Sequence, residues 1–192
     1  MRVIAGRFRS RTIHSVKGEW LRPTADRTRE FVFSWLGNLV EGARVLDLFA
    51  GTGSLGIEAI SRGARAATFV DSSPAAYNLL RRNLESLGIE AALHRQEALT
   101  FLKMAARLQQ RYDLIFCDPP YRYQDIGLIL SQVQSGQLLE SKGLFVYEAS
   151  SRDKFSCPEP WRALKVKILG DTQIIFCGLS DDQENSDLSG LL

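Results

Sequence analysis

From Ala43 onward, short apolar runs alternate with amphipathic segments, and this alternation constrains the fold more than any other feature of the sequence. The apolar runs predict strands, and the segments between them carry apolar residues at helical spacing. The last two predicted strands lack a helix between them and meet at Gly170-Asp171-Thr172, which indicates a hairpin. Together these features predict an α/β fold, in which a doubly wound, mostly parallel sheet ends in an antiparallel edge hairpin.

Seven strands and four helices are expected after residue 42. The strands are expected at 44–48, 66–70, 91–94, 112–117, 143–148, 163–169 and 173–177. The helices are expected at 55–62, 74–88 and 126–139, and in the segment that carries Leu99, Leu102, Ala106 and Leu108. Ser72 or Ser73 is expected to cap the second helix, which holds Pro74 in its first turn.

The pattern divides the chain into a basic N-terminal extension, the strand–helix repeats and an acidic tail expected to be disordered: 1–42, 43–179 and 180–192. Residues 1–15 alternate basic and small apolar side chains, which predicts a short β-hairpin. That hairpin would place Arg7, Arg9 and Arg11 on one face. A plainer interpretation is that these charges keep a solvated edge strand from aggregating.

Thr24 is expected to cap a helix before the repeats, because an apolar stripe follows it at helical spacing. The stripe consists of Phe31, Trp35, Leu36 and Leu39. Arg27 and Arg29 lie in the first turn, where the helix dipole favours acids, and this suggests phosphate binding. Both could equally pair with Asp26 or Glu30. The candidate RNA-binding residues are therefore Arg7, Arg9, Arg11, Arg22, Arg27 and Arg29.

Composition argues against several classes of protein. Lys and Arg total 24 and Asp and Glu total 22, so the net charge of +2 alone does not indicate a nucleic-acid binder, although the arginines cluster at the start. Three scattered cysteines and two distant histidines are too few for a disulfide framework or a metal site, which predicts a metal-free cytoplasmic protein. We expect no secretory signal and no membrane span, because arginines interrupt the start and the longest uncharged apolar stretch, 31–40, is short.

The turn after the first predicted strand of the repeats is rich in glycine. Residues 51–56 fit G-x-G-x-x-G, and Asp71 follows 20 residues after Gly51, as in a dinucleotide-binding fingerprint. These glycines let the backbone approach a ligand closely, and Asp71 can accept hydrogen bonds from ribose hydroxyls. Both features suit NAD, and both suit any other adenosine cofactor.

Asp47 separates these two cofactor classes. It ends the strand before the glycine turn, where it would repel a dinucleotide pyrophosphate. S-adenosylmethionine has no phosphate and carries an ammonium and a sulfonium, so Asp47 would attract it. The sequence therefore favours S-adenosylmethionine, while Asp47 as a hydrogen-bonding residue at the sheet end is the alternative.

A second turn combines a carboxylate with two prolines and an aromatic ring. Asp118-Pro119-Pro120-Tyr121 follows a buried apolar run, and the prolines should stop that strand at Asp118. Ligands bind outside the carboxyl ends of strands in open α/β sheets. A carboxylate, the Pro119 carbonyl and the Tyr121 ring at that position suit a planar base with an exocyclic amine.

Both turns resemble motifs of class I AdoMet-dependent methyltransferases. Residues 46–53, Leu-Asp-Leu-Phe-Ala-Gly-Thr-Gly, are similar to their first motif, and residues 118–121 are similar to the (Asn/Asp)-Pro-Pro-(Tyr/Phe) motif of enzymes that methylate exocyclic or amide nitrogens. Segments 2–7 and 21–30 resemble the RsmD family, which methylates N2 of a guanine in bacterial 16S ribosomal RNA. The resemblance covers 1–179 and implies a Rossmann-like class I methyltransferase fold that acts on 16S ribosomal RNA or the small ribosomal subunit.

The resemblance also implies roles for single residues. The methionine end of the cofactor is expected on Asp47 and on the backbone of Phe49, Ala50, Gly51, Thr52 and Gly53. Asp71, helped by Ser72, would hold the ribose hydroxyls. Glu97 stands where such enzymes usually have an Asp contacting the adenine amino group, and Ala98 would add a backbone contact. Glu97 as a simple acid at the start of the next helix is the alternative.

The implied chemistry is direct, in-line methyl transfer to guanine N2 without a covalent enzyme intermediate. Asp118 and the Pro119 carbonyl would accept hydrogen bonds from the amine, and Tyr121 would stack on the unstacked base. Arg122 and Tyr123 would line the mouth of the site, while the N-terminal arginines grip phosphates. The protein is expected to be a monomer.

Three other functions remain open at this stage. A DNA adenine-N6 methyltransferase would share both motifs, although such enzymes normally carry an added target-recognition domain. A non-catalytic RNA-binding or ribosome assembly factor would explain the basic edge but not the Asp118 turn beside a glycine loop. A dehydrogenase would bind NAD and leaves Asp47 unexplained.

Overall fold

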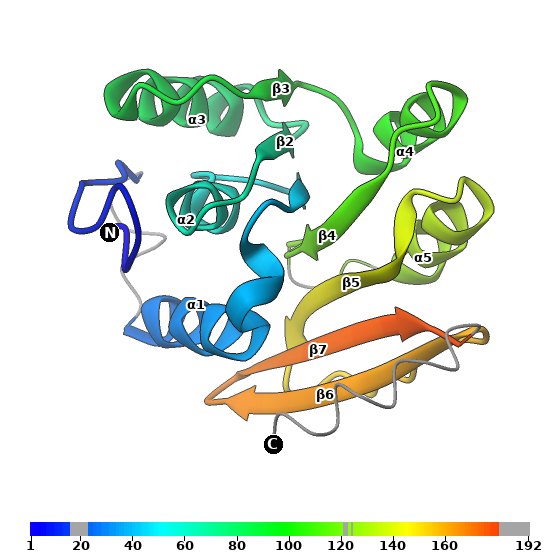
Figure 1. The fold of residues 1–192 in the computed structure, drawn as a ribbon. Helices are drawn as coiled ribbons and strands as arrows, with labels where there is room; N and C mark the ends of the chain where they lie inside the picture. Colours follow the sequence, from blue (N-terminus) through cyan, green and yellow to red (C-terminus); the bar gives the residue numbers. More distant parts are fainter. Residues whose placement is uncertain (16–22, 121–122, 124, 181–192) are drawn as a thin grey trace.

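A computed structural model of the chain describes residues 1–15, 23–120, 123 and 125–180. The framework is one seven-stranded sheet with the order β3-β2-β1-β4-β5-β7-β6 (Figure 1). The strands are β1 Arg44–Leu48, β2 Ala66–Val70, β3 Ala92–His94, β4 Tyr112–Cys117, β5 Leu139–Ser150, β6 Trp161–Leu169 and β7 Thr172–Leu179. The five strands β1 to β5 run parallel, and β7 lies antiparallel between β5 and β6. The predicted mostly parallel sheet with an antiparallel edge hairpin is therefore confirmed.

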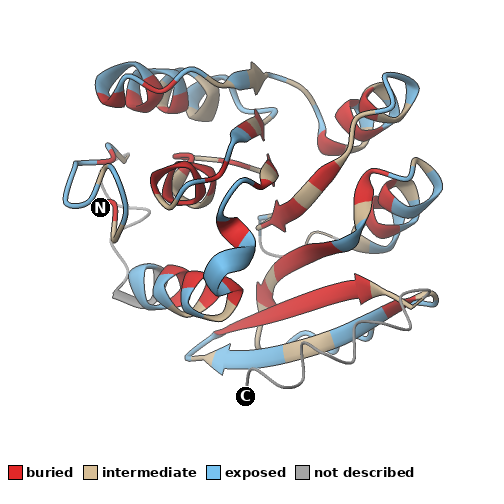
Figure 2. Ribbon diagram, viewed as in Figure 1, coloured by how far each residue is buried: buried red, intermediate tan, exposed pale blue. Residues whose placement is uncertain are grey.

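Helices cover both faces of the sheet, as repeated parallel βα units require. They are α1 Pro23–Leu36 with the 3-10 turn η1 Gly37–Val40, α2 Ser54–Ser61, α3 Pro74–Leu87, α4 Ala98–Arg107 and α5 Ile126–Ser135. Figure 1 shows α1, α2 and α3 on one face and α4 and α5 on the other. Two apolar clusters result, one on each face, and β1 is almost wholly buried between them. Figure 2 shows that β4 and β7 are also largely buried, while β6 is mostly exposed.

Helix α3 illustrates how local sequence sets an element. Ser73 precedes it in an extended conformation and accepts a hydrogen bond from the amide of Ala76, 3.3 Å away. Pro74 occupies the first position, where its missing N–H costs nothing. Gly88 ends the helix with φ 67°, a left-handed conformation that glycine adopts without strain. The predicted cap and end of this helix are confirmed.

The sequence misplaces the boundary between α5 and β5. The helix ends at Ser135 rather than near residue 139, and β5 begins at Leu139 rather than at 143. The chain turns at Gln137, where φ is 49°, and the Leu138 carbonyl then accepts a hydrogen bond from the amide of Tyr112 in β4. Leu138 and Leu139 thus begin the pairing with β4, although their apolar side chains fit a helix equally well.

Two predicted helix faces are also corrected. Leu39 is 39% exposed and Leu108 is 62% exposed, so neither lies on an inner stripe. In α1 the buried side chains include Phe33, whose ring lies 5.7 Å from that of Phe116 in β4. In α4 the fully buried residues are Phe101, Ala105 and Leu102, of which only Leu102 was expected on the inner face. Helix α1 also begins at Pro23, so Thr24 lies inside its first turn rather than before it.

The first residues form a short hairpin with one β-bridge between Arg2 and Thr12. The amide of Val3 donates to the Arg11 carbonyl at 3.0 Å. Residues 7–10 form the turn. Arg7 and Arg9 therefore lie in a turn, and the strand alternation expected to put three arginines on one face does not apply there. Most of the predicted acidic tail, 181–192, lies outside the described residues.

Glu58 of α2 fastens this N-terminal hairpin to the sheet domain. Its fully buried carboxylate accepts hydrogen bonds from the amides of Ile4 at 2.8 Å and Ala5 at 3.0 Å. Arg62, one turn later, donates to the same carboxylate at 2.8 Å. Two backbone donors and one arginine therefore compensate the burial of this charge.

Asn83 of α3 makes a second connection. Its Oδ1 accepts from the amide of His14 at 2.8 Å, and its Nδ2 donates to the carbonyls of His14 at 3.0 Å and Thr52 at 2.9 Å. Asn83 is fully buried, and these bonds occupy both ends of its amide. One side chain thus joins the hairpin, α3 and the glycine turn after β1.

Candidate active site

Four acids lie at or near the carboxyl ends of four neighbouring strands, on one side of the sheet. They are Asp71 after β2, Asp47 in β1, Asp118 after β4 and Glu148 in β5. Leu48 pairs with Val70 and with Cys117, and Cys117 pairs with Tyr147, so the four carboxyl ends meet in register. Two residues before each acid stands a member of the apolar cluster that packs under α1, α2 and α3. These members are Val45 for Asp47, Phe69 for Asp71, Phe116 for Asp118 and Val146 for Glu148. Since side chains alternate along strands, all four acids belong to that face.

The turn after β1 brings backbone close to this acidic edge. Gly51 and Gly53 have φ of 54° and 79°, which other residues adopt only with strain. A Cβ at Gly53 would lie 2.2 Å from Cδ1 of Leu80, so α3 packs directly on the turn. The amide of Ala50 donates to the Val70 carbonyl at 3.0 Å, and that of Gly53 donates to the Ala50 carbonyl at 2.7 Å. The turn therefore has a fixed backbone against which a ligand can rest.

Asp47 is the most buried of the acids, at 2% exposure. The pKa of Asp47 is raised to about 8, mainly by burial and to a smaller extent by the charges of Asp118 and Asp71, against a hydrogen bond from the Gly56 amide that lowers it. That bond, 2.9 Å to Oδ2, bears out the alternative in which Asp47 is a hydrogen-bonding residue at the sheet end. It occupies one oxygen only, so the role in cofactor binding stays compatible with it.

Asp71 ties the second strand to the glycine turn. Its Oδ2 accepts from the amide of Gly51 at 2.8 Å, and its Oδ1 accepts from the amide of Ser73 at 2.9 Å. Ser72 beside it is exposed. A carboxylate has about four acceptor positions, so two remain for hydroxyl groups of a ligand. The geometry fits the predicted ribose contact.

Asp118 opens the turn after β4. Burial raises the pKa of Asp118 to about 7. The Pro120 carbonyl accepts from the amide of Tyr123 at 3.1 Å, whereas the Pro119 carbonyl accepts no hydrogen bond from any described residue. The Asp118 carboxyl likewise accepts no hydrogen bond from a residue that the structure describes, so two acceptors without a described partner stand next to each other.

The aromatic part of this turn is only partly described. Tyr121, the predicted stacking residue, and Arg122 lie outside the described residues. The ring of Tyr123 lies 5.0 Å from that of Phe49 in the glycine turn, at an angle of 68°. Phe49 and Tyr123 thus connect the two motif turns by an aromatic contact across the acidic edge.

Glu148 is an acid that motif reasoning missed. It lies inside an apolar run, and only the pairing of β5 with β4 places it beside Asp118. Burial, and to a smaller extent the charge of Asp118, raise the pKa of Glu148 to about 9. Among the described residues no arginine or lysine forms an ion pair with Asp47, Asp71, Asp118 or Glu148. Such an edge favours a cationic ligand and repels a pyrophosphate.

The predicted adenine contact lies at the start of α4. Glu97 is exposed at the N-cap position, and its side chain accepts no bond from the helix amides. Ala98 follows it and is buried. The Glu97 carboxylate is therefore free to meet a ligand, as the predicted adenine contact requires.

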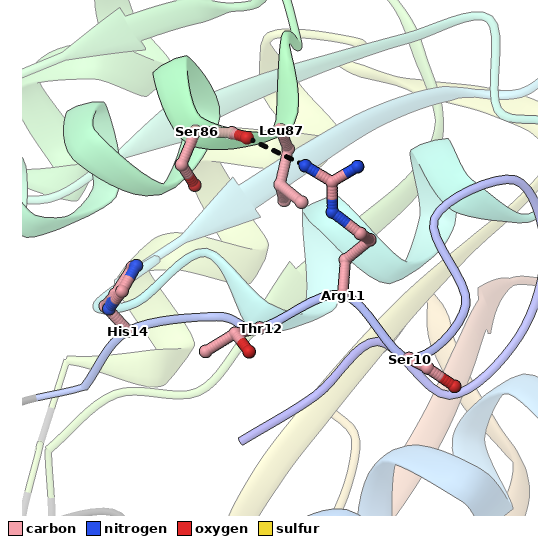
Figure 3. A pocket seen from close by; sticks show the side chains of 6 residues that line it. All are labelled: Ser10, Arg11, Thr12, His14, Ser86 and Leu87. Atoms are coloured by element: carbon pink, nitrogen blue, oxygen red, sulfur yellow. Dashed lines mark hydrogen bonds between the residues drawn. The ribbon is translucent and has the colours of Figure 1, made fainter.

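The candidate RNA-binding arginines separate into different environments. Arg7, Arg9, Arg11 and Arg27 are exposed, and Arg22 lies outside the described residues. The Arg7 guanidinium lies 4.4 Å from the centre of the Phe8 ring. Arg11 donates to the Ser86 carbonyl at 3.2 Å, beside a hollow of about 270 Å³ (Figure 3). The hollow is lined by Ser10, Arg11, Thr12, His14, Ser86 and Leu87.

Arg29 is a structural residue, contrary to its assignment to RNA. It is 3% exposed and donates to Oδ1 of Asp26 at 3.0 Å and to the Arg2 carbonyl at 2.6 Å. Its Nε lies 3.9 Å from the buried Glu58. Burial lowers the pKa of Arg29, against the opposing charges of Glu58 and Asp26. The alternative of pairing within the protein is the correct one for this residue.

Two negative findings apply to the part of the chain that the structure describes. Within the ranges given above, no group of three or more His, Cys, Asp or Glu side chains could hold a metal ion. No helix there has the length and hydropathy to cross a membrane.

The strand order, the antiparallel β7 and the acid-ended β1 before a glycine turn define a class I, Rossmann-like methyltransferase fold. The chain belongs to the RsmD family, since the model of the family described as Conserved hypothetical protein 95 matches residues 1–178. A Haemophilus influenzae relative named ribosomal RNA small subunit methyltransferase D is 35% identical over 88% of this chain and 89% of its own.

Solved structures give the same fold. The Escherichia coli protein yhhF is 30% identical and superposes with a TM-score of 0.82 over 93% of this chain and 97% of its own. SMU.776, solved in complex with SAH, is only 18% identical and has a TM-score of 0.69 over 82% of this chain and 50% of its own. Its likeness concerns the fold alone.

Proposed function

We propose that this protein transfers a methyl group from S-adenosylmethionine to the exocyclic N2 of a guanine in small-subunit ribosomal RNA. One observation carries the proposal: Asp47, Asp118 and Glu148 lie toward the carboxyl ends of the neighbouring strands β1, β4 and β5, with pKa values raised to about 8, 7 and 9 and no described cation to pair with. A ligand with an ammonium and a sulfonium supplies the missing positive charge. The RNA target is supported by the name of the Haemophilus influenzae relative.

The residues around the edge fit this cofactor. Asp47 and the glycine turn would hold its charged methionine end, and Asp71 would hold the ribose through its two free acceptor positions. Glu97 and the backbone of Ala98 would meet the adenine from the start of α4. The fixed turn backbone and the left-handed Gly51 and Gly53 give the close approach that such contacts need.

On the substrate side, Asp118 and the Pro119 carbonyl would accept the two hydrogens of the amine. Those bonds turn the nitrogen lone pair, otherwise delocalised into the ring, toward the methyl group. Holding amine and methyl in line can lower the barrier by about 7–11 kcal/mol. Tyr121 would stack on the base and contribute about 1–3 kcal/mol.

The reaction needs an acceptor for one proton. When bound, S-adenosylmethionine supplies a methyl group, and the electron pair of the broken sulfur–carbon bond stays on sulfur. The amine nitrogen gains a bond to carbon and must lose a hydrogen. Asp118 hydrogen-bonds that hydrogen in our proposal, and burial already raises the pKa of Asp118 to about 7. Asp118 therefore can take the proton and pass it to water.

The N-terminal hairpin would bind the RNA around the target base. Arg7, Arg9 and Arg11 are exposed on it, and Arg27 is exposed on α1. Phosphate contacts of this kind fix position without reading sequence. The target base would be unstacked, at a cost of a few kcal/mol.

A labelling experiment tests the function. The protein is incubated with tritiated S-adenosylmethionine and, in separate reactions, with small ribosomal subunits that lack their native methylations, with free 16S ribosomal RNA and with DNA. We expect label in RNA, recovered as N2-methylguanosine after digestion to nucleosides. Label only in DNA, or no label from folded protein, would overturn the proposal.

A further inference from the structure

Glu148 occupies a position that the proposed mechanism leaves without a role. Cys117 of β4 pairs with Tyr147 of β5, so the next residues along the two parallel strands, Asp118 and Glu148, lie side by side. Adjacent strands are about 4.8 Å apart. Both acids lie two residues beyond members of one apolar cluster, Phe116 and Val146, and therefore belong to the same face of the sheet.

The fold does not explain why an acid stands there. Glu148 lies between Tyr147 and Ala149, both buried, and opposite Ile174 of β7. Its carboxyl accepts no hydrogen bond and forms no ion pair with any residue that the structure describes. Burial and the neighbouring Asp118 charge raise the pKa of Glu148 to about 9. A partly buried acid with no partner next to the amine-binding turn indicates a ligand contact.

Guanine presents such a contact. Its Watson–Crick edge carries two donors next to each other, the N2 amine and the N1–H, and proteins read bases on this edge when they are unstacked. Adenine carries an acceptor at N1 beside its amine. Strand β4 lies between β1 and β5. With the amine held by Asp118 and the Pro119 carbonyl, the base can turn its N1 position toward β5, where Glu148 lies next to Asp118.

We propose that Glu148 selects guanine by accepting a hydrogen bond from N1–H while Asp118 holds the amine. This inference rests on the proposed function. The pKa of about 9 is that of the ligand-free site, and the positive charge of bound S-adenosylmethionine would lower it and favour the ionised carboxylate. Ionised Glu148 would face the lone pair of N1 in adenine and repel it, whereas the N1–H of guanine satisfies the carboxylate. The pair of acids on β4 and β5 therefore matches the pair of donors on guanine.

The test replaces the N1–H donor of the base in one arm and the carboxylate acceptor of Glu148 in the other. Once mapping of labelled RNA fragments has located the methylated guanine, the same RNA is prepared with 2-aminopurine at that position, which keeps the N2 amine but has an acceptor at N1. Wild-type protein should prefer guanine by about 100-fold in kcat/KM, because a site built for a hydrogen bond rejects an analogue that lacks it. Glu148→Gln can turn its amide N–H toward N1, so its preference for guanine should fall at least tenfold. Glu90→Gln, at an exposed carboxylate, is the matched control.

The outcomes separate the two proposals. No transfer to guanine RNA by the wild-type protein refutes the proposed function itself. Transfer to guanine and 2-aminopurine at equal rates by the wild-type protein overturns the role of Glu148, whether or not a variant folds. An unchanged preference in folded Glu148→Gln overturns it too. A fall in preference in Glu148→Gln, absent in Glu90→Gln, supports it.

Discussion

The amide nitrogen of Gly56 donates a hydrogen bond of 2.9 Å to Oδ2 of Asp47, which joins the buried end of β1 to the first turn of α2. The contact is tight. A Cβ at Gly56 would lie 2.3 Å from the Phe69 ring and 3.1 Å from the same Asp47 oxygen. The position of the Asp47 carboxyl thus depends on the absence of a side chain at Gly56.

Gly56→Ala should therefore both destabilise the protein and weaken cofactor binding. We expect a loss of about 1–3 kcal/mol in the free energy of unfolding, because overpacking forces neighbours to shift. Urea denaturation measures the loss, and calorimetry measures the affinity for S-adenosylmethionine. Gly127→Ala in α5 is the control, since a Cβ there meets nothing within 4 Å. Equal behaviour of the two variants would contradict the prediction.

The stability of the ligand-free protein should fall as pH rises. The pKa values of Asp47, Asp118 and Glu148 are raised from 3.8, 3.8 and 4.5 to about 8, 7 and 9, so the folded state binds more protons than the unfolded chain between these limits. The stabilisation is complete below about pH 4 and is lost by about pH 9. We expect the melting temperature to drop from pH 5 to pH 8.5 on the order of several degrees, and to drop less in Asp47→Asn.

Cofactor binding should show the reverse dependence. A cation prefers the ionised carboxyls, so S-adenosylmethionine should bind more tightly as pH rises and should release protons on binding. Calorimetry in buffers of different ionisation enthalpy counts those protons. Proton uptake, or an affinity independent of pH, would show that the acidic edge is not where the cation binds.

Asp118→Asn should greatly slow methyl transfer and leave the affinity for S-adenosylmethionine nearly unchanged. The side chain keeps its size but loses the charge that directs the amine, and we expect kcat to fall by about 10²–10³. The dissociation constant for S-adenosylmethionine should stay within a few-fold, because Asp47 and the glycine turn are intact. Single-turnover labelling and calorimetry measure the two quantities. A variant that transfers at the wild-type rate would remove Asp118 from the mechanism.

Replacing Arg7, Arg9 and Arg11 together by Ala should weaken RNA binding. Each lost phosphate contact should reduce the slope of log affinity against log salt by about 0.7–0.9. Binding assays from 50 to 200 mM salt, roughly the range over which such slopes are read, give the value. Arg152→Ala, an exposed arginine between β5 and β6, is the control. An unchanged slope would support the plainer interpretation, in which these arginines only keep a solvated edge strand from aggregating.

Arg29→Ala should act on folding instead. Removing one member of a buried ion pair costs about 3–5 kcal/mol, and Arg29 serves both Asp26 and Glu58. Arg27→Ala, two residues earlier and exposed, should change stability by no more than about 0.5 kcal/mol. Urea denaturation distinguishes them. If Arg29→Ala instead lowers only the salt slope of RNA binding, the structural role given to Arg29 is wrong.

Much of the fold could be read from local pattern. Pro119 and Pro120 stop the strand 112–117, and a capping serine and a terminal glycine mark the two ends of α3, so both elements were predicted closely. The end of α5 was not, because Leu138 and Leu139 continue an apolar pattern that only pairing with β4 resolves. Burial of Phe101 in place of Leu108 likewise depends on how α4 packs.

The residues of the candidate site also divide into those that local sequence predicts and those that only the folded structure reveals. Asp47, Asp71 and Asp118 were identifiable because each ends a predicted strand beside a motif turn. Glu148 had no such signal, since its relation to the site exists only through the register of β5 with β4. Nor could the sequence distinguish a phosphate-binding Arg29 from a buried one, because the Asp26 pair is visible locally but Glu58 is 29 residues away.

The bonds of Glu58 and Asn83 change what the smallest stable fragment of this protein can be. A fragment that begins at Ala43 keeps all seven strands yet loses Ile4, Ala5 and His14, whose amides satisfy both buried side chains. Each buried polar group left without a partner costs about 1–3 kcal/mol, out of a total stability of about 5–15 kcal/mol for a typical domain. A stable fragment therefore has to include the first 15 residues as well as the strands of the sheet.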